Sequence, residues 1–307
     1  MIASHEYRVQ DTKSKMSILQ DRDLPIAFTK MSGTGNDFII IDHREQFISE
    51  DMQAEFARLV CRRKFSAGAD GLILIENSAI ADFRWQFYNG DGSRAEMCGN
   101  GARCAARFAF ANKIAPAKMR FETTAGEIEA QILDESGGTV KIQLTGPQDL
   151  RLQIPLTVGG TEQVVHFINT GVPHTVLLVG EANQVPVADW GRTIRFHDLF
   201  QPAGTNANFA QVHDHDTLKV RTYERGVEDE TMACGTGAVA AALIAALLDQ
   251  AVPPVSVITS GGERLTIHFS VTGEPGSRQL DPAAGIFLEG PAHIIYEGQL
   301  NSDAFYE

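Results

Sequence analysis

Apolar residues are distributed along the chain in many short runs bounded by turn-forming residues. These runs predict strands at 38–42, 71–75, 83–87, 127–133, 139–144, 164–169, 174–179, 208–212, 218–224, 264–271 and 285–288. The run at 71–75 is continuously apolar, whereas 83–87 alternates as a half-buried strand should. Short gaps between successive runs favour mostly non-parallel pairing. The pattern therefore predicts a protein dominated by strands.

Three stretches have helical character. The first, at 50–63, has acidic residues in its first turn and four apolar residues at helical spacing: Met52, Phe56, Leu59 and Val60. The other two begin after Cys98, running to about residue 112, and after Cys234, running to about residue 248. The last helix is almost wholly apolar, and a helix that is apolar on all sides has to be surrounded.

The chain repeats one short sequence. Residues 98–106 read Cys-Gly-Asn-Gly-Ala-Arg-Cys-Ala-Ala, and residues 234–242 read Cys-Gly-Thr-Gly-Ala-Val-Ala-Ala-Ala. The segments 123–127 and 259–263 lie at the same separation of 136 residues, and each half closes with an apolar strand that ends in Gly-Pro. A looser similarity links 33–38 with 204–209. Agreement at several landmarks indicates an internal duplication.

The duplication and the strand pattern together predict an α/β (α+β) fold with two pseudo-symmetric homologous domains. Each would be a curled mixed or antiparallel sheet wrapped around a central apolar helix. We expect the halves at 26–148 and 149–291, with residues 292–307 available to return to the first half. Residues 1–25 are polar, lack the hydrophobic centre of a secretory signal, and are expected to form a flexible extension.

Composition narrows the class of partner. The net charge of −13 argues against nucleic acid or an anionic membrane as the main partner, and no run approaches the length of a membrane span. The four cysteines are too few in 307 residues for a disulfide scaffold, so the cytoplasm is the default compartment.

A cysteine at the start of a helix has distinctive chemistry. It lies beside backbone N–H groups that carry roughly +0.5 charge, and that field lowers the pKa of a thiol. The neighbouring glycines let the same N–H groups approach a carboxylate. Two such sites facing one small anion would suit stereochemical inversion: one thiolate removes a proton beside a carboxylate, and the opposite thiol returns one. This scheme needs neither metal nor pyridoxal.

Other interpretations remain open at this point. The two cysteines could be buried structural residues, a zinc site, or a redox pair that cycles through a disulfide. The matching contexts disfavour the first, and the absence of a Cys-x-x-Cys or a nearby His pair disfavours the second. Cys61, inside the first predicted helix, and Cys104, nearly two turns beyond Cys98, are expected to be buried and inert.

Several motifs resemble those of diaminopimelate epimerase, the pyridoxal-independent enzyme of lysine and peptidoglycan-precursor synthesis. They are Lys-Met-Ser-Gly-Thr-Gly-Asn-Asp-Phe at 30–38, Tyr-Asn-Gly-Asp-Gly-Ser at 88–93, Met-Cys-Gly-Asn-Gly at 97–101, Tyr-Glu-Arg-Gly at 223–226 and Glu-Thr-Met-Ala-Cys-Gly-Thr-Gly at 230–237. The resemblance extends from Phe28 nearly to the C-terminus. It implies a cofactor-independent epimerase that interconverts LL- and meso-diaminopimelate.

The resemblance also implies roles for individual residues. Cys98 and Cys234 match the acid/base pair. Four residues match those that hold the carboxylate at the reacting centre in the family: Gly99, Asn100, Gly235 and Thr236. Five others match residues that contact the substrate elsewhere: Asn36, Asn89, Asn206, Glu224 and Arg225. His174 and Glu224 match residues that tune the thiols. An Arg for a distal carboxylate and amide or acid oxygens for an ammonium are chemically sensible.

Two departures leave alternatives open. Many members of the family have Gly-Asn-Pro-His where this chain has Gly-Val-Pro-His at 171–174, so Val172 removes one possible contact. The stretch 226–231 is one residue longer than the common form and has Asp229 in place of a glycine. Val172 therefore leaves a racemase of another amino acid as an alternative. Outside enzymology, a redox-sensing or ligand-binding protein is a further alternative. A small-molecule substrate is expected in each enzymatic case, and a homodimer is compatible with the resemblance.

Overall fold

The computed structural model describes residues 24–95 and 97–306, so the predicted N-terminal extension lies outside the described residues except for its last two positions. The described residues divide into two compact units. One comprises residues 24–140 and 291–306, and the other comprises residues 141–290.

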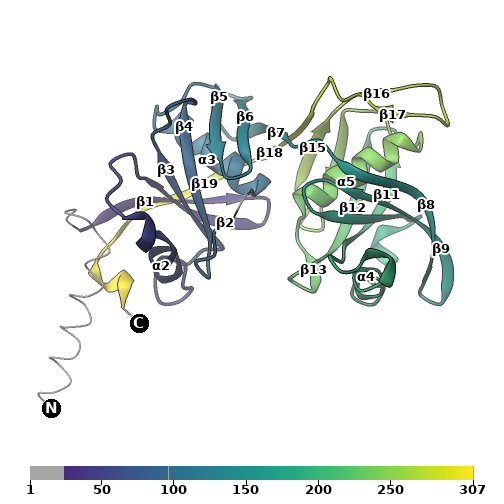
Figure 1. Ribbon diagram of the computed structural model, residues 1–307, viewed down its shortest axis with the longest axis horizontal. Coiled ribbons are helices and arrows are strands. Elements are labelled where there is room, and N and C mark those ends of the chain that lie inside the picture. The colour runs from purple at the N-terminus through teal and green to yellow at the C-terminus, as the bar shows by residue number, and fades with distance from the viewer. Residues whose placement is uncertain (1–23, 96, 307) are drawn as a thin grey trace, which may run out of the picture. The chain divides into compact units, whose positions relative to one another are not determined.

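The first unit is a mixed sheet with two α-helices (Figure 1). In chain order its elements are β1 Ile26–Gly33, β2 Asn36–Asp42, α2 Glu50–Val60, β3 Gly71–Glu76, β4 Phe83–Asn89, α3 Gly99–Ala111, β5 Lys118–Thr123, β6 Gly126–Ile132, β19 His293–Leu300 and the 3₁₀ turn η3 Ser302–Phe305. Strand β7, Thr139–Leu144, leads into the second unit.

The second unit is also a mixed sheet with two α-helices (Figure 1). Its elements are β8 Gln148–Val158, β9 Thr161–Asn169, β10 Pro173–Leu178, η1 Ala182–Gln184, α4 Val187–Arg195, η2 Asp198–Phe200, β11 Asn206–Asp214, β12 Thr217–Glu224, β13 Asp229–Thr231, α5 Gly235–Leu247, β14 Val255–Ile258, β15 Arg264–His268, β16 Val271–Thr272, β17 Gln279–Leu280 and β18 Ile286–Pro291.

The two sheets have the same strand order and the same strand directions. In the first unit the order is β19-β1-β2-β3-β4-β5-β6, and in the second it is β8-β9-β10-β11-β12-β14-β15. The parallel pairs are β2–β3 and β4–β5 in the first unit, and β10–β11 and β12–β14 in the second. These pairs occupy the same places in the two orders, and the other pairs are antiparallel. Each parallel pair is joined through a helix, as crossover geometry requires. The units are therefore two copies of one topology, and the predicted fold class is confirmed.

Strand register defines which residues of the two units are equivalent. Phe38 pairs with Gly71 across β2 and β3, and His174 pairs with Asn206 across β10 and β11. Phe38 and His174 are separated by 136 residues, as are Cys98 and Cys234. Two residues further along β3 and β11, the equivalent residues are Ile73 and Asn208.

The helix that begins after each cysteine packs on its own sheet. Helix α5 contacts strands β9, β10, β11, β12, β14 and β15, and it lies within the curl of the second sheet in Figure 1. Every residue from Gly237 to Leu247 is buried, which is why the sequence of this helix is apolar on all sides. Helix α3 contacts β1, β2, β3 and β6, and it presents Arg107 and Phe110 on its less buried side.

Strand β4 differs from its prediction because both of its faces are covered. The alternation at 83–87 predicted a solvated face for Arg84 and Gln86, but Gln86 is buried and donates to Glu76 at 3.3 Å. Helix α2 covers this face, since the Tyr88 hydroxyl donates to Gln53 of α2 at 2.9 Å. The same two-sided burial explains the unbroken apolar run of β3.

Other differences concern missed elements, element ends and one equivalence. The prediction lacked α4 and the strands β1, β5, β8 and β14. Helix α2 ends at Val60 rather than at residue 63, because the N–H groups of Gly68 and Ala69 take up its last carbonyls as the chain turns toward β3. Strand β15 stops at His268, before the predicted end at residue 271. The similarity of 204–209 to 33–38 is not an equivalence, because 204–209 enters β11, which is the counterpart of β3.

Replacement of a core leucine in α5 tests whether this helix holds the second unit together. Leu243 is fully buried, so Leu243→Ala should lower the free energy of unfolding by about 2–5 kcal/mol, measured in urea. Leu199→Ala in the same unit removes a side chain that is 51% exposed, and should change it by less than about 0.5 kcal/mol. Equal effects of the two changes would contradict this account of the core.

Candidate active site

Cys98 and Cys234 occupy the same position in their units. Each is the N-cap residue of a 13-residue helix, with extended backbone dihedrals of −147°, 116° for Cys98 and −122°, 106° for Cys234. Neither side chain caps its helix, so the first-turn N–H groups are not taken up by the thiol in the way that a Ser or Asp would take them up. Both thiols are partly exposed, and both stand beside the positive end of a helix dipole.

The other two cysteines are buried, as predicted. Burial raises the pKa of Cys61 to about 12 and that of Cys104 also to about 12. Cys104 packs under the end of β1, where a Cβ at Gly33 would lie 3.1 Å from its Sγ and 2.8 Å from the Asn100 carbonyl oxygen. A glycine at position 33 therefore lets the β1–β2 turn approach the start of α3.

A buried arginine organises the start of α3. Arg103 is fully buried, and its Nη2 donates to the Thr34 hydroxyl at 2.6 Å and to the Asn100 amide oxygen at 2.8 Å. Its Nη1 also donates to the Gly99 carbonyl at 3.4 Å. One guanidinium thus joins the turn before β2 to the first turn of α3, using the fixed fork of donors that only arginine offers.

This arginine sets the orientation of two asparagines that the sequence proposes for substrate binding. Because the Asn100 oxygen accepts from Arg103, its amide nitrogen faces Asn36 and donates to the Asn36 oxygen at 2.8 Å. The Asn36 nitrogen then donates to Asp70 at 3.0 Å. Asn36, Asn100 and the Cys98 helix start therefore form one hydrogen-bonded group.

The charges beside this group are paired. Burial opposes ionisation of Asp37, but hydrogen bonds from Arg63 and Lys30 outweigh it and lower the pKa of Asp37. Arg63 also contacts Asp70 at 2.8 Å. Asn89 lies at the end of β4, opposite Gly71 in the register, and donates to the Ser93 hydroxyl at 2.9 Å. Asn89 and Asn36 therefore lie at the same end of the sheet, but Asn89 is not hydrogen-bonded to the group that contains Asn36.

In the second unit a buried histidine lies beneath the start of α5. His174 is fully buried, and its Nε2 lies 2.9 Å from the Thr236 hydroxyl oxygen. That oxygen lies 3.6 Å from the Cys234 Sγ. Burial and the charge of Arg225 lower the pKa of His174 to about 3, so its imidazole is neutral at pH 7.

The remaining proposed residues of the second unit gather at the same end of its sheet. Asn206 is buried, donates to the Pro173 carbonyl at 3.0 Å and accepts from the Arg225 N–H at 2.8 Å. The Arg225 guanidinium donates to the Ala203 carbonyl at 2.9 Å. Burial raises the pKa of Glu224 despite a 2.8 Å hydrogen bond from the Thr231 hydroxyl.

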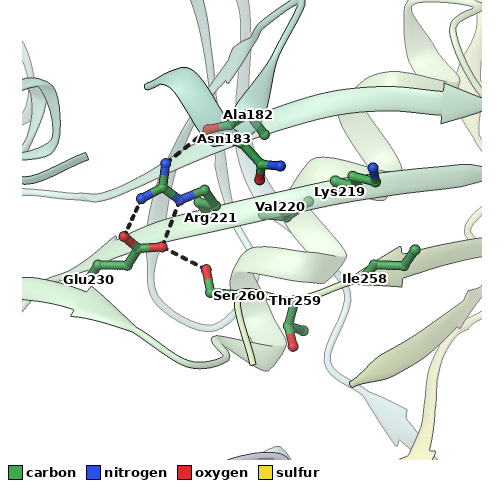
Figure 2. Close-up of a pocket in the computed structure, with 9 residues that line it drawn as sticks. All are labelled: Ala182, Asn183, Lys219, Val220, Arg221, Glu230, Ile258, Thr259 and Ser260. Carbon is green, nitrogen blue, oxygen red and sulfur yellow. Dashed lines mark hydrogen bonds and ion pairs between the residues drawn. The ribbon is translucent and has the colours of Figure 1, made fainter. Parts of the chain in front are cut away.

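An ion pair anchors the segment that leads from β13 to Cys234. Arg221 holds Glu230 through two bonds of 2.8 and 2.6 Å, and Ser260 donates to the same carboxylate at 2.7 Å (Figure 2). These side chains line a pocket of about 550 Å³, and none of its lining residues is one that the sequence proposed for the site. Arg221, Glu230 and Ser260 thus satisfy one another within the pocket.

Sequence reasoning missed the residues that support the site from beneath: Arg103, Thr34, Asp70, Asn208, Thr222 and Thr231. Two of them carried a signal. Arg103 is one of two charges in a helix of small and apolar residues, and Asn208 is a polar residue inside an apolar strand. Such residues are buried only when they are satisfied, so each pointed to a polar network.

The structure describes residues 24–95 and 97–306. They contain no group of three or more His, Cys, Asp or Glu side chains arranged to hold a metal ion. None of their helices is both long enough and apolar enough to cross a membrane.

Solved structures show which class of fold this is. A phenazine biosynthesis protein of the PhzF family from Bacillus anthracis superposes with a TM-score of 0.68 at 16% identity, covering 91% of this chain and 100% of that one. A hydroxyproline epimerase from Agrobacterium vitis superposes with a TM-score of 0.61 at 14% identity, covering 92% and 95%. The chain therefore has the two-domain fold that the PhzF-family protein and the hydroxyproline epimerase share.

Sequence comparison defines the family. The diaminopimelate epimerase profile matches residues 28–149 and 166–284. A protein of Aquifex aeolicus named diaminopimelate epimerase is 48% identical over 285 residues, covering 90% of this chain and 98% of that protein. One of Methanocella arvoryzae with the same name is 40% identical, covering 91% and 98%. The chain belongs to the diaminopimelate epimerase family and is an isomerase, which confirms the predicted resemblance.

Thiol labelling tests the division of the cysteines into two classes. Iodoacetamide at pH 7.5 should modify Cys98 and Cys234 in the native protein and spare Cys61 and Cys104, because burial keeps the latter two protonated up to a pH near 12. Mass mapping after labelling in urea should find all four modified. Rapid native labelling of Cys61 or Cys104 would contradict the burial.

Proposed function

We propose that this protein interconverts LL- and meso-diaminopimelate without a cofactor. The observation that carries the proposal is the duplicated helix start, with a partly exposed thiol at the N-cap of both α3 and α5. The names of its relatives, up to 48% identical across nearly their whole length, support diaminopimelate as the substrate.

The proposed reaction uses Cys98 and Cys234 as a base and an acid. One cysteine, as thiolate, takes the proton from the α-carbon and becomes a thiol. The other, as thiol, gives its proton to the opposite face of the same carbon and becomes a thiolate. No electrons are gained or lost overall, and the reverse reaction exchanges the two roles. Inversion requires the base and the acid on opposite faces, which two equivalent helix starts can supply.

The helix starts also stabilise the charge that develops on the carboxylate. Backbone N–H groups of Gly99 and Asn100 in α3, and of Gly235 and Thr236 in α5, are the proposed donors to it. As the α-proton leaves, negative charge spreads onto the carboxylate, and fixed N–H dipoles stabilise that charge without reorganising. This interaction is stronger in the transition state than in the ground state, so it lowers the barrier.

The residues at the sheet ends are proposed to bind the rest of the substrate. Those in the first unit are Asn36 and Asn89; those in the second are Asn206, Glu224 and Arg225. Arg225 would pair with the distal carboxylate, and amide and carboxylate oxygens would accept from the distal ammonium. We propose that His174 and Glu224 tune the thiols. The reaction belongs to lysine and peptidoglycan-precursor synthesis, for which the cytoplasm is the proposed location.

One observation favours a second candidate function, racemisation of another amino acid. Val172 lies two residues before His174, as Asn36 lies two residues before its equivalent Phe38, so the second unit lacks an amide where the first unit has one. A racemase of a one-headed amino acid would need fewer such contacts. Comparing diaminopimelate with lysine, glutamate and proline in one assay separates the two functions, since only a diaminopimelate epimerase will strongly prefer the two-headed substrate.

Substitution of either thiol tests the two-base reaction. Cys98→Ala and Cys234→Ala should each lower the rate of inversion by about 10² to 10⁴, since each removes an essential proton carrier. The rate is measured by proton NMR of diaminopimelate isomers in deuterated water, which follows α-hydrogen exchange together with inversion. Cys104→Ala is the control and should keep its activity. A rate within about tenfold of wild type in either thiol variant would contradict the mechanism.

Substitution of Arg225 tests recognition of the distal end. Arg225→Lys keeps the charge but loses the planar fork, so KM for diaminopimelate should rise about tenfold or more while kcat changes less. Arg192→Lys, on the exposed side of α4, is the matched control and should leave both constants unchanged. An unchanged KM in Arg225→Lys would assign the distal carboxylate to another residue.

A further inference from the structure

The two units differ at three equivalent buried positions beneath their helix starts. In the first unit these positions hold Phe38, Ile73 and Phe87, which are neighbours across β2, β3 and β4. All three are buried, and the two phenyl rings meet edge to face at 5.9 Å. This is ordinary apolar packing, and it shows that the fold can fill these positions without any polar atom.

In the second unit the same positions hold His174, Asn208 and Thr222. The residues are again buried, and Asn208 pairs with Thr222 across β11 and β12 as Ile73 pairs with Phe87. The glycines of the two helix starts confirm the equivalence independently. A Cβ at Gly101 would lie 3.3 Å from Ile73, and a Cβ at Gly237 would lie 2.3 Å from the Asn208 oxygen. Burying polar groups where apolar ones fit lowers stability, so the substitution calls for a functional reason.

The partners of Asn208 fix the orientation of its amide. Its nitrogen donates to the Thr175 carbonyl at 3.0 Å, and a carbonyl oxygen can only accept. Its oxygen accepts from the Thr222 hydroxyl at 2.9 Å. The reversed amide would set two oxygens against each other at Thr175. The same nitrogen lies 3.2 Å from the Nδ1 of His174, so the amide is the donor and Nδ1 is the acceptor.

The direction of this hydrogen bond determines where the imidazole carries its proton. A neutral histidine has one N–H, and a ring nitrogen that accepts a hydrogen bond has none. His174 therefore carries its proton on Nε2, which donates to the Thr236 hydroxyl oxygen at 2.9 Å. The Thr236 hydroxyl hydrogen then has to point away from His174, and the Cys234 sulfur lies 3.6 Å from that oxygen.

We propose that Asn208 is a positioning residue that holds His174 as its Nε2–H tautomer, so that the Thr236 hydroxyl donates to the thiolate of Cys234. Thr222 supports it by fixing the Asn208 amide. Asn100, the counterpart of Thr236, is instead oriented by Arg103, so the two thiols have different support. The role assigned to the thiolate rests on the proposed function, whereas the placement of the proton does not.

Nitrogen NMR of the full-length wild-type protein tests the tautomer directly. With the imidazole nitrogens labelled, a long-range nitrogen–proton correlation distinguishes a protonated from an unprotonated ring nitrogen for each of the nine histidines. The His174 signals are those lost in His174→Gln. We expect an unprotonated Nδ1 and a protonated Nε2 at pH 7. A protonated Nδ1, alone or together with Nε2, would overturn the proposal.

Thiol alkylation then tests the link from Asn208 to Cys234. Asn208→Leu keeps the size of the side chain but removes the donor to Nδ1, and should slow alkylation of Cys234 by about threefold to tenfold, the loss of one hydrogen bond to a charged sulfur. Alkylation of Cys98 in the same molecule is the internal reference and should not change. Ile73→Leu, at the equivalent position of the first unit, is the matched control and should leave the Cys234/Cys98 ratio as in wild type.

Each outcome has a separate meaning. An unchanged ratio in Asn208→Leu would overturn the link to the thiol, and Thr222→Val provides the same test with a smaller change if Asn208→Leu does not fold. Because neither NMR nor alkylation uses substrate, a protein that fails to exchange the α-hydrogen of diaminopimelate would defeat the proposed function alone. The tautomer and the alkylation ratio would still decide this inference.

Discussion

Both units depend on the same feature: a helix begins at a partly exposed cysteine whose side chain does not cap the first N–H groups. An ordinary N-cap side chain would take up one of these donors, but a cysteine does not. The thiol and the N–H groups are thereby kept together at one point. Gly33 lets the β1–β2 turn approach the start of α3, and Gly237 lets the start of α5 approach Asn208 on β11.

The two units support this feature with different chemistry. In the first, a buried Arg103 joins Thr34 to Asn100 and so fixes the first turn of α3. In the second, the residue equivalent to Arg103 is Val239, and the first turn of α5 is fixed through His174 and Thr236 instead. A duplicated fold has kept its topology while its buried polar contacts have diverged. Divergence of this kind is expected where the site, rather than the core, is under constraint.

Much of the fold followed from local patterns. Eleven strands and the two helices after Cys98 and Cys234 were predictable, because short apolar runs and small-residue helices carry strong periodic signals. Helix α4, the long strand β8 and the two-sided burial of β4 were not, because they depend on what packs against each element. The candidate catalytic residues were found through the repeated phrase, whereas the buried residues that support them had only weak local signals.

The sequence alone determined that this chain is a duplication with one cysteine at each of two helix starts. Both features are local, because the repeated segment and the helix after it are formed by consecutive residues. The tertiary structure decided which side chains lie beneath those starts. Hydrogen-bond partners such as Asn208 and His174 lie 34 residues apart, and strand pairing brings them together. No local pattern specifies the direction in which an amide points or the ring nitrogen that carries a proton, because both depend on every neighbour in the folded interior.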